Sequence, residues 1–329
     1  MPGYKSTEVG HRHRIRRCGH APDLSAEGRE RGIVEARRNR KDDMRRPALL
    51  NCKKMNELSP LEIYNEFHDD IQAIFRSRLL TQVMIALGSG SKPLSILRDI
   101  TGSSSQALIP KIRQLEALHY VESVRGDYAL TAMGRIVEPK IERVVMVMGM
   151  LQRHRDFWIE HDIEGIPPEF LREIQHLYNS KVVKDVEEDI FVVYAAFLTI
   201  LKEASWIHGV SSIMSQVLAN AIKEAVLDGR PVELIVSQKL AQTLTAEPYD
   251  AVLGSLKGHT NFSIYVSSSP VKLGMTVTDR YLSLGLYGHD TGTYDAATDL
   301  ISTDAVAISW GERLFQHYKA DAKPLKLPR

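Results

Sequence analysis

Residues 93–131 read PLSILRDITGSSSQALIPKIRQLEALHYVESVRGDYALT. A short helical pattern at residues 94–100 is followed by Gly102, by a longer helical pattern that ends near Leu118, and by two β-rich runs at residues 120–124 and 127–130. A short helix, a glycine turn, a second helix and a two-stranded hairpin form the layout of a winged helix-turn-helix, which places one helix in the DNA major groove. This stretch therefore predicts double-stranded DNA as a partner.

The helix after Gly102 is expected to bury one face and to expose the other. Ser103 should cap this helix, with Gln106 as its reciprocal partner three residues later. Pro110 lies inside the helix and predicts a kink or a loose first turn, because proline removes a backbone hydrogen bond. The residues expected to contact bases or phosphates lie in the first turn, on the exposed face and at the turn of the hairpin: Ser104, Ser105, Gln106, Lys111, Arg113 and Arg125.

The charge of this motif is only weakly basic. Residues 92–135 hold 6 Lys+Arg and 4 Asp+Glu, a net charge of +2. Winged helices also serve as protein-docking modules, and the low charge leaves that alternative open. A homodimer would double the phosphate contacts available to the protein.

Residues 1–56 show no sustained apolar periodicity and are strongly basic, with 15 Lys+Arg against 7 Asp+Glu. We expect a disordered basic tail, which could also act as an arm for phosphate contacts. The chain's two cysteines, Cys18 and Cys52, lie in this segment and exclude a disulfide framework. A metal site is a further alternative, although the spacing of its candidate ligands fits no common zinc pattern: His11, His13, Cys18 and His20.

The overall composition is that of a globular chain, with 43% hydrophobic and 25% charged residues among 329. No run approaches ~18 consecutive apolar residues, so we expect no membrane partner. The N-terminus lacks the apolar core of a signal peptide, which favours a cytoplasmic location.

Residues 57–158 are expected to form the winged-helix DNA-binding domain. A capping box at Ser59-Pro60-Leu61-Glu62 opens a helical pattern that continues to about Leu87. Thr131 should cap a later helix that runs toward Trp158 and carries a wide apolar stripe. That helix is expected to form a homodimer, and the alternative is that it packs only within its own domain.

Residues 159–182 read as a connector, and residues 183–329 as an α/β domain. Helices are expected at residues 190–204, 215–227 and 305–318. Strands are expected at residues 206–210, 232–236, 262–266, 272–278 and 281–286, the last two forming a hairpin around Asp279-Arg280. Alternation of helices and strands indicates an α/β sheet domain.

Several segments beyond the helix-turn-helix carry a family resemblance. They are DFWIEHDIEGIP at residues 156–167, GVSSI at 209–213, VTDRYLSL at 277–284, and a C-terminal segment with YD at 294–295, DLIS at 299–302 and WGERLF at 310–315. In this order and spacing the chain resembles archaeal winged-helix regulators of the methanogenesis-regulator (Fil) family over residues 58–320. The resemblance implies a transcription regulator with a C-terminal sensor domain that is similar to phospholipase D-like folds without catalysis. It also implies that residues 1–56 are foreign to the family pattern.

A sensor domain implies a small-molecule effector, whose identity the sequence does not disclose. Ligands of α/β sheets commonly bind at strand ends, and polar residues at expected strand ends are the candidates. The alternative is that these residues only cap helices and form turns. The candidates for effector binding are Ser211, Ser212, Thr278, Asp279, Arg280, Asp295, Asp299 and Ser302.

The expected protein is not an enzyme and needs no cofactor or metal. A phospholipase D-type phosphodiesterase uses two His-x-Lys motifs, each followed four residues later by Asp, so that one His attacks phosphorus and the other protonates the leaving group. This chain has one such motif, His317-Tyr318-Lys319, with Pro324 at the Asp position. A phosphodiesterase therefore remains only as an alternative function. Isolated histidines of the second half are expected to be structural: His208, His259 and His289.

Overall fold

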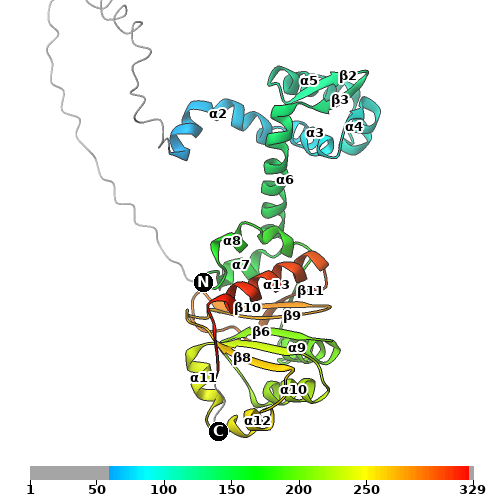
Figure 1. Cartoon of the computed structure of the whole chain (residues 1–329). Helices are drawn as coiled ribbons and strands as arrows, with labels where there is room; N and C mark the ends of the chain where they lie inside the picture. The colour runs from blue at the N-terminus through cyan, green and yellow to red at the C-terminus, as the bar shows by residue number, and fades with distance from the viewer. Residues whose placement is uncertain (1–58, 326–329) are drawn as a thin grey trace, which may run out of the picture. The chain divides into compact units, whose positions relative to one another are not determined.

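A computed structural model describes residues 59–325 of the chain (Figure 1). The expectation of a disordered tail at residues 1–56 lies outside the described residues. The chain divides into two units, residues 1–71 and residues 72–329. In the first unit, the predicted capping box opens α2 (Pro60–Arg76): the backbone N–H of Ser59 donates to Oε2 of Glu62 (2.8 Å), and that of Glu62 donates to Oγ of Ser59 (3.3 Å).

The single helix expected from residue 59 to residue 87 is wrong, because the chain kinks at Phe67 inside α2 (φ −115°, ψ 19°) and is interrupted again at Ser77. Ser77 has extended backbone angles (φ −110°, ψ 108°) and precedes a separate helix, α3 (Arg78–Gly88). The hydroxyl of Thr81 donates to the carbonyl oxygen of Ile74 across the break (2.8 Å). A side-chain hydroxyl thus serves a backbone group that the interrupted helix leaves without a partner.

The predicted winged helix-turn-helix is present in the second unit. It consists of α3, α4 (Leu94–Thr101), α5 (Ser105–Ala117) and a three-stranded sheet in the order β1 (Lys92–Pro93), β3 (Asp127–Leu130), β2 (Val121–Val124). Gly102 ends α4 in the left-handed region (φ 61°), a conformation that glycine adopts at little cost. Three apolar residues of α5 are buried against α3 and α4, as expected: Leu108, Ile112 and Leu115.

Two details of α5 differ from the expectation. The N-cap is Ser104, whose Oγ accepts from the N–H of Ala107 (3.3 Å), whereas the hydroxyl of Ser103 donates to the carbonyl oxygen of Thr101 (3.3 Å). The helix also runs through Pro110 as one element, where a kink or a loose first turn was expected. Pro110 lies on the exposed face, where water can hydrogen-bond the carbonyl group that proline leaves unpaired.

The long helix that follows the wing is α6 (Ala132–Arg153). Thr131 is its predicted N-cap: its Oγ1 accepts from the N–H of Gly134 (3.1 Å) and donates to the carbonyl oxygen of His119 (2.5 Å). The helix ends at His154 rather than near Trp158, because His154 leaves helical geometry (φ −118°, ψ 36°) and its Nε2 lies 3.3 Å from the carbonyl oxygen of Tyr178. A short α7 (Arg155–Glu160) follows.

The remainder of the chain is built on one mixed sheet. Its order is β12 (Lys323–Pro324), β8 (Phe262–Val266), β7 (Val232–Val236), β6 (Ile207–Ser211), β9 (Leu273–Thr278), β10 (Leu282–Gly288), β11 (Thr298–Ser302) and β5 (Lys181–Lys184); β4 (His161–Asp162) also pairs with β10. Strands β6, β7 and β8 are parallel, and the other pairs are antiparallel. The five predicted strands and the hairpin at Asp279-Arg280 are present, whereas β4, β5, β11 and β12 were not predicted.

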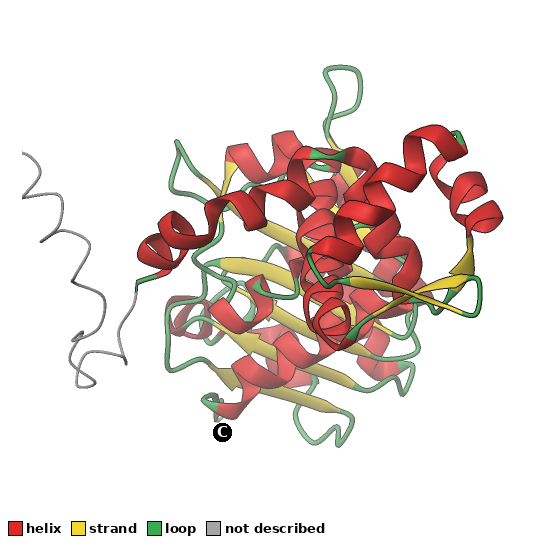
Figure 2. Ribbon diagram, turned by 90° about the horizontal axis from the view of Figure 1, so that it is seen from above, coloured by secondary structure: helices red, strands yellow, loops and turns green. Residues whose placement is uncertain are grey.

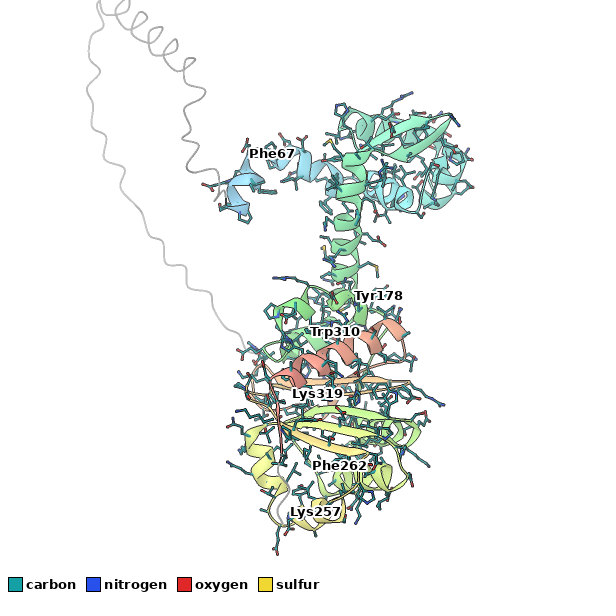
Figure 3. The ribbon with its side chains drawn as sticks, viewed as in Figure 1. Phe67, Tyr178, Lys257, Phe262, Trp310 and Lys319 are labelled. Atoms are coloured by element: carbon teal, nitrogen blue, oxygen red, sulfur yellow. The ribbon has the colours of Figure 1, made fainter. Side chains whose placement is uncertain are left out.

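Helices cover both faces of this sheet (Figures 1 and 2). One face packs on α13 (Ala305–Ala320), on α7, on α8 (Pro168–Leu171) and on η2 (Ile174–Leu177), around the fully buried Trp310 (Figure 3). The other face packs on α9 (Val192–Glu203), α10 (Gln216–Leu227), α11 (Gln238–Leu244) and α12 (Asp250–Ser255). Residues 159–182, expected as a connector, contribute buried side chains to the first core: Ile166, Phe170, Ile174 and Leu177.

None of the helices within residues 59–325 is both long and apolar enough to cross a membrane.

The contact between α6 and the start of the wing leaves no room for a side chain at Gly134. A Cβ atom there would overlap the carbonyl oxygen of Tyr120, which accepts a hydrogen bond from the N–H of Thr131 (3.1 Å). We expect Gly134→Ala to lower the free energy of unfolding by about 1–3 kcal/mol in urea unfolding. Gly254→Ala in α12 is the control, because its Cβ would meet nothing within 4 Å, and it should be neutral or mildly stabilising. Equal effects of the two substitutions would contradict the contact.

Candidate functional site

The predicted DNA-contacting residues gather on the exposed side of α5 and on the wing. Ser104 and Gln106 are exposed, Ser105 and Lys111 are half-buried, and Arg113 is exposed one turn before the end of the helix. Arg125 lies in the two-residue turn between β2 and β3 and has a positive φ of 54°. With Gly126 (φ 94°), it forms a turn with positive φ at both central positions, which suits a tight hairpin.

Local partners moderate the positive charge of this surface. The guanidinium group of Arg113 lies 2.8 Å from Oε2 of Glu116, and Nζ of Lys111 lies 3.5 Å from Oε1 of Gln114. The Oγ of Ser104 is committed to its capping bond. A phosphate group would therefore have to compete with Glu116 for Arg113.

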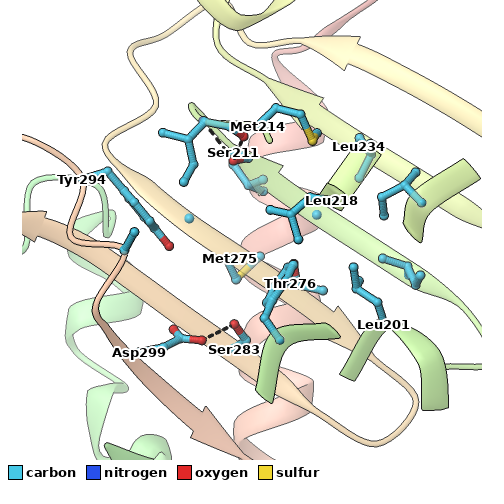
Figure 4. Close-up of a pocket in the computed structure, with 18 of the residues that line it drawn as sticks. Leu201, Ser211, Met214, Leu218, Leu234, Met275, Thr276, Ser283, Tyr294 and Asp299 are labelled. Carbon is cyan, nitrogen blue, oxygen red and sulfur yellow. Dashed lines mark hydrogen bonds between the residues drawn. The ribbon is translucent and has the colours of Figure 1, made fainter. Parts of the chain in front are cut away.

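A second candidate site is a pocket of about 140 Å³ in the α/β domain (Figure 4). It lies between the sheet and the helices α9 and α10, and its wall is mostly apolar. Phe197 and Leu201 of α9 and Leu218 and Ile222 of α10 form the helical side, and Thr276 of β9 contributes to the sheet side. The volume is close to that of a cavity of ~150 Å³ that binds benzene in another protein.

The pocket exists because two neighbouring strands carry small residues on one face. In β9 and β10, leucine, methionine and valine alternate with smaller residues, and the large residues pack into the core on the α13 side. Gly274 pairs with Gly285 on the opposite face, and the ring of Tyr294 lies over both glycines. A Cβ on Gly274 would come within 2.6 Å of the Tyr294 hydroxyl, and one on Gly285 would overlap it. The glycine pair therefore makes the space that Tyr294 occupies.

Asp299 on β11 is the acidic group of this pocket. Its side chain is buried, and its Oδ2 accepts a hydrogen bond from the hydroxyl of Ser283 (2.5 Å). Its Oδ1 is buried without a hydrogen-bond partner among the described residues. Burial penalises the carboxylate and raises the pKa of Asp299 to about 7, although the Ser283 hydroxyl and nearby backbone N–H groups oppose this shift.

Tyr294 packs against residues that are themselves fixed by hydrogen bonds. Its ring meets that of Tyr287 edge-on (centroids 5.9 Å apart), and the Tyr287 hydroxyl lies 2.5 Å from that of Ser212. The next residue, Asp295, lies 3.1 Å from Nε2 of His161, whose Nδ1 donates to the carbonyl oxygen of Phe157 in α7 (2.7 Å). Burial raises the pKa of Tyr294, so its hydroxyl stays neutral.

The structure divides the eight predicted effector residues into three groups. Ser211 and Asp299 line the pocket, and Ser212 and Asp295 support its wall through Tyr287 and His161. The other four serve turns away from the pocket. Thr278 accepts from the N–H of Tyr281, Asp279 from Ser205, and Ser302 from the N–H of Asp304, while Arg280 pairs with Asp279 at 3.6 Å.

Four polar residues of the pocket were not predicted: Tyr194, Thr276, Ser283 and Tyr294. The available signal was the alternation in LSLGL at residues 282–286, in which every second residue is small. Strict alternation shows that the two faces of a strand meet different surroundings. Small residues on one face indicate that a bulky group packs against that face.

The single His-x-Lys motif is engaged in structural contacts. His317 lies 3.2 Å from Glu169, the hydroxyl of Tyr318 donates to the carbonyl oxygen of Gly165 (2.6 Å), and Lys319 pairs with Glu233. Within residues 59–325 no group of three or more His, Cys, Asp or Glu side chains could hold a metal ion.

Two of the isolated histidines have carboxylate partners. His208 lies 2.8 Å from Glu312 and stacks on Phe315, and His289 lies 2.7 Å from Asp162. The hydrogen bond to Asp162 raises the pKa of His289.

These features define a class: a winged-helix protein with an α/β domain that holds a mostly apolar pocket. Residues 68–149 match the N-terminal domain of methanogenesis regulatory protein FilR1, and residues 190–321 match its middle domain. Together the two matches span more than half of the chain, which therefore belongs to the FilR1 family of regulatory proteins.

A curated relative is methanogenesis regulatory protein FilR1 of Methanothrix harundinacea, which is 25% identical over 268 residues. The match covers 78% of this chain and 58% of the relative, so the chain spans less than two thirds of that protein's length.

Two solved structures share a distant likeness with the chain. TrmBL2, an archaeal chromatin protein, has 15% identity and a TM-score of 0.36, with 79% of this chain and 99% of that chain covered. Nuc from Salmonella typhimurium, a phospholipase D family member, has 10% identity and a TM-score of 0.35, with 44% and 96% covered. At these TM-scores neither likeness bears on the function of this chain.

The raised pKa of Asp299 makes stability depend on pH. An unfolded Asp titrates near pH 4, so between about pH 4 and 7 the folded chain binds more protons than the unfolded chain. The free energy of unfolding contributed by Asp299 therefore falls as pH rises through that window. The substitution Asp299→Asn removes the titrating group. We expect its effect on the free energy of unfolding to be more favourable at pH 8 than at pH 5, by on the order of a few kcal/mol.

The measurement is urea unfolding of both proteins at pH 5 and pH 8. The exposed Asp99→Asn is the matched control and should leave the pH dependence of the native chain unchanged. If the Asp299→Asn protein retained that same pH dependence, the carboxyl group would not be the buried acid described above.

Proposed function

We propose that this chain is a transcription regulator that binds double-stranded DNA through its winged helix and is controlled by a small effector in the α/β domain. Residues 57–158 form the DNA-binding part in this proposal, and residues 183–329 the sensor part. The observation that carries the proposal is the exposed polar face of α5 next to the Arg125 turn, within a chain of a regulatory protein family.

The geometry of α5 supports insertion into a major groove. The helix has 13 residues and buries only its α3- and α4-facing side, which leaves Gln106, Lys111 and Arg113 for contacts with DNA. Amide and guanidinium groups can read base edges in the major groove, and a wing arginine can meet phosphate or the minor groove.

The weak net charge of the motif supports binding as a dimer. A single winged helix offers few cations, and Arg113 already has Glu116 beside it. Two copies would double the phosphate contacts and the number of base contacts.

Helix α6 provides an apolar surface for this dimer. Ile136 is 70% and Met148 is 61% exposed, and Val144, Val145 and Leu151 are exposed on the same helix. Apolar residues at this spacing form a stripe that a second copy of the helix would cover. We therefore propose a homodimer in which α6 pairs with the α6 of the other copy.

DNA binding is tested by fluorescence anisotropy on the DNA upstream of the chain's own gene, against a scrambled fragment, as salt is varied. We expect specific binding, with an association constant whose logarithm falls steeply as the logarithm of the salt concentration rises. Arg113→Ala and Arg125→Ala should each weaken binding, and loss of one phosphate contact should reduce the salt slope by about 1.

Lys239→Ala is the control, because Lys239 is an exposed cation on α11. Unchanged affinity in both arginine variants would contradict the proposed surface. Equal affinity for the two fragments, with no dependence on salt concentration, would favour a protein-docking module instead.

The dimer is tested by light scattering on the full chain. We expect a mass twice that of the chain for the native protein, and dissociation toward the monomer for Met148→Glu, because a carboxylate would be buried in the α6 stripe. Arg135→Glu changes an exposed polar position on the opposite side of the same helix and should leave the mass unchanged. A monomeric native protein would contradict the dimer.

A further inference from the structure

The pocket of the α/β domain has one polar end in an otherwise apolar wall. Aromatic rings of Tyr194 and Phe197 join the aliphatic side chains of α9 and α10, and Tyr294 enters from the segment before β11 (Figure 4). Apolar walls with a few placed polar groups are typical of small-molecule sites. The volume of about 140 Å³ accommodates a body of about the size of benzene with a short head group.

Asp299 determines which head group fits. Among the residues that line this pocket it is the only acid, and no Lys, Arg or His lies in the lining. Its Oδ2 is satisfied by Ser283, whereas its buried Oδ1 has no hydrogen-bond partner among the described residues. A buried acceptor without a partner is costly, and a buried carboxylate without a counter-charge is more costly still.

We propose that the pocket binds a compact apolar amine, with its hydrocarbon body between α9 and α10 and its ammonium group on Oδ1 of Asp299. The inference rests on the proposed function only for the regulatory role of that amine. An ammonium group supplies both the donor and the positive charge that Asp299 lacks.

Other head groups fit less well. A carboxylate or phosphate would face Asp299 without a cation to compensate it, and like charges at short distance repel. An alcohol could donate to Oδ1 but would leave the charge unpaired. An ammonium group has three donors, and the hydroxyl groups of Thr276 and Tyr294 in the lining are further acceptors that the pocket holds. The aromatic walls also attract a cation.

The position of Tyr294 connects the amine to the rest of the protein. Asp295, the next residue, pairs with His161, which in turn hydrogen-bonds Phe157 in α7, the helix that follows α6. An amine that displaces or fixes the Tyr294 ring would act on this chain of contacts. An effector must bind two conformations with different affinity, and Tyr294 is the group through which this amine would distinguish them.

The test is isothermal titration calorimetry of the full chain with three probes of equal body: benzylamine, benzyl alcohol and benzoate. We expect benzylamine to bind at least tenfold more tightly than benzyl alcohol, and benzoate to bind more weakly than either. Asp299→Asn should remove the advantage of benzylamine over benzyl alcohol, while Asp290→Asn should retain it. Benzoate binding as tightly as benzylamine, or benzylamine binding that is unchanged in Asp299→Asn, would overturn the proposal.

A second pair of variants tests the place of binding without touching Asp299. Leu218 of α10 points into the pocket, whereas Val217 beside it is exposed (Figure 4). Leu218→Trp should fill the pocket and abolish benzylamine binding, and Val217→Trp should leave it intact. Urea unfolding of each variant shows that it is folded. Full benzylamine affinity in a folded Leu218→Trp protein would place the ligand elsewhere and overturn the inference.

A separate titration of DNA with and without benzylamine distinguishes the inference from the proposed function. Asp299-dependent benzylamine binding by a chain that binds no DNA would contradict the regulator and support the ligand site. DNA binding by a chain without Asp299-dependent benzylamine binding would support the regulator and contradict the ligand site.

Discussion

The α/β domain depends on the approach of one ring to two glycines. Gly274 and Gly285 face each other across β9 and β10, and only the absence of both Cβ atoms lets the Tyr294 ring lie on the sheet. The ring brings the segment before β11 over the strands, so that Asp299 can enter the space under α9 and pair with Ser283. The same strands present leucine, methionine and valine to the α13 side, where they complete the core around Trp310. One alternation of large and small residues thus makes a closed core on one side of the sheet and a pocket on the other.

In the winged helix, backbone groups are positioned by small and hydroxylated residues at element ends. Gly102 turns the chain in the left-handed region, and Ser104 caps α5 so that its first turn is exposed. Thr131 joins the end of the wing to the start of α6 by accepting from Gly134 and donating to His119. Because these bonds satisfy groups that a helix end leaves free, they set the direction of α5 and α6 relative to the wing.

Features determined by local sequence could be predicted, and those determined by distant partners could not. Strands β7 and β8 lie at the residues that their β-branched and aromatic runs indicated, and the helix-turn-helix follows from Gly102 and the flanking apolar periods. Strand β5 was missed because its partner β11 is far away in the chain, and β11 was missed because polar residues interrupt its short apolar run. The sequence does not distinguish among three successive serines as the cap of α5, because each hydroxyl can accept the capping bond, and no glycine or proline marks the break at Ser77. Tyr294 was missed because glycines 9 and 20 positions before it make its place.

The two walls of the pocket differ in their freedom to vary. The strand side is fixed by backbone pairing and by the glycines under Tyr294, so a larger residue there would displace the ring and the strand that follows. The helical side consists of ordinary side chains on α9 and α10, whose backbones do not depend on the identity of each residue. Change in ligand preference is therefore expected to accumulate on the helices while the strands stay constant. In the regulator proposed above, a few helical substitutions would change the ligand while the fold and the winged helix stayed unaltered.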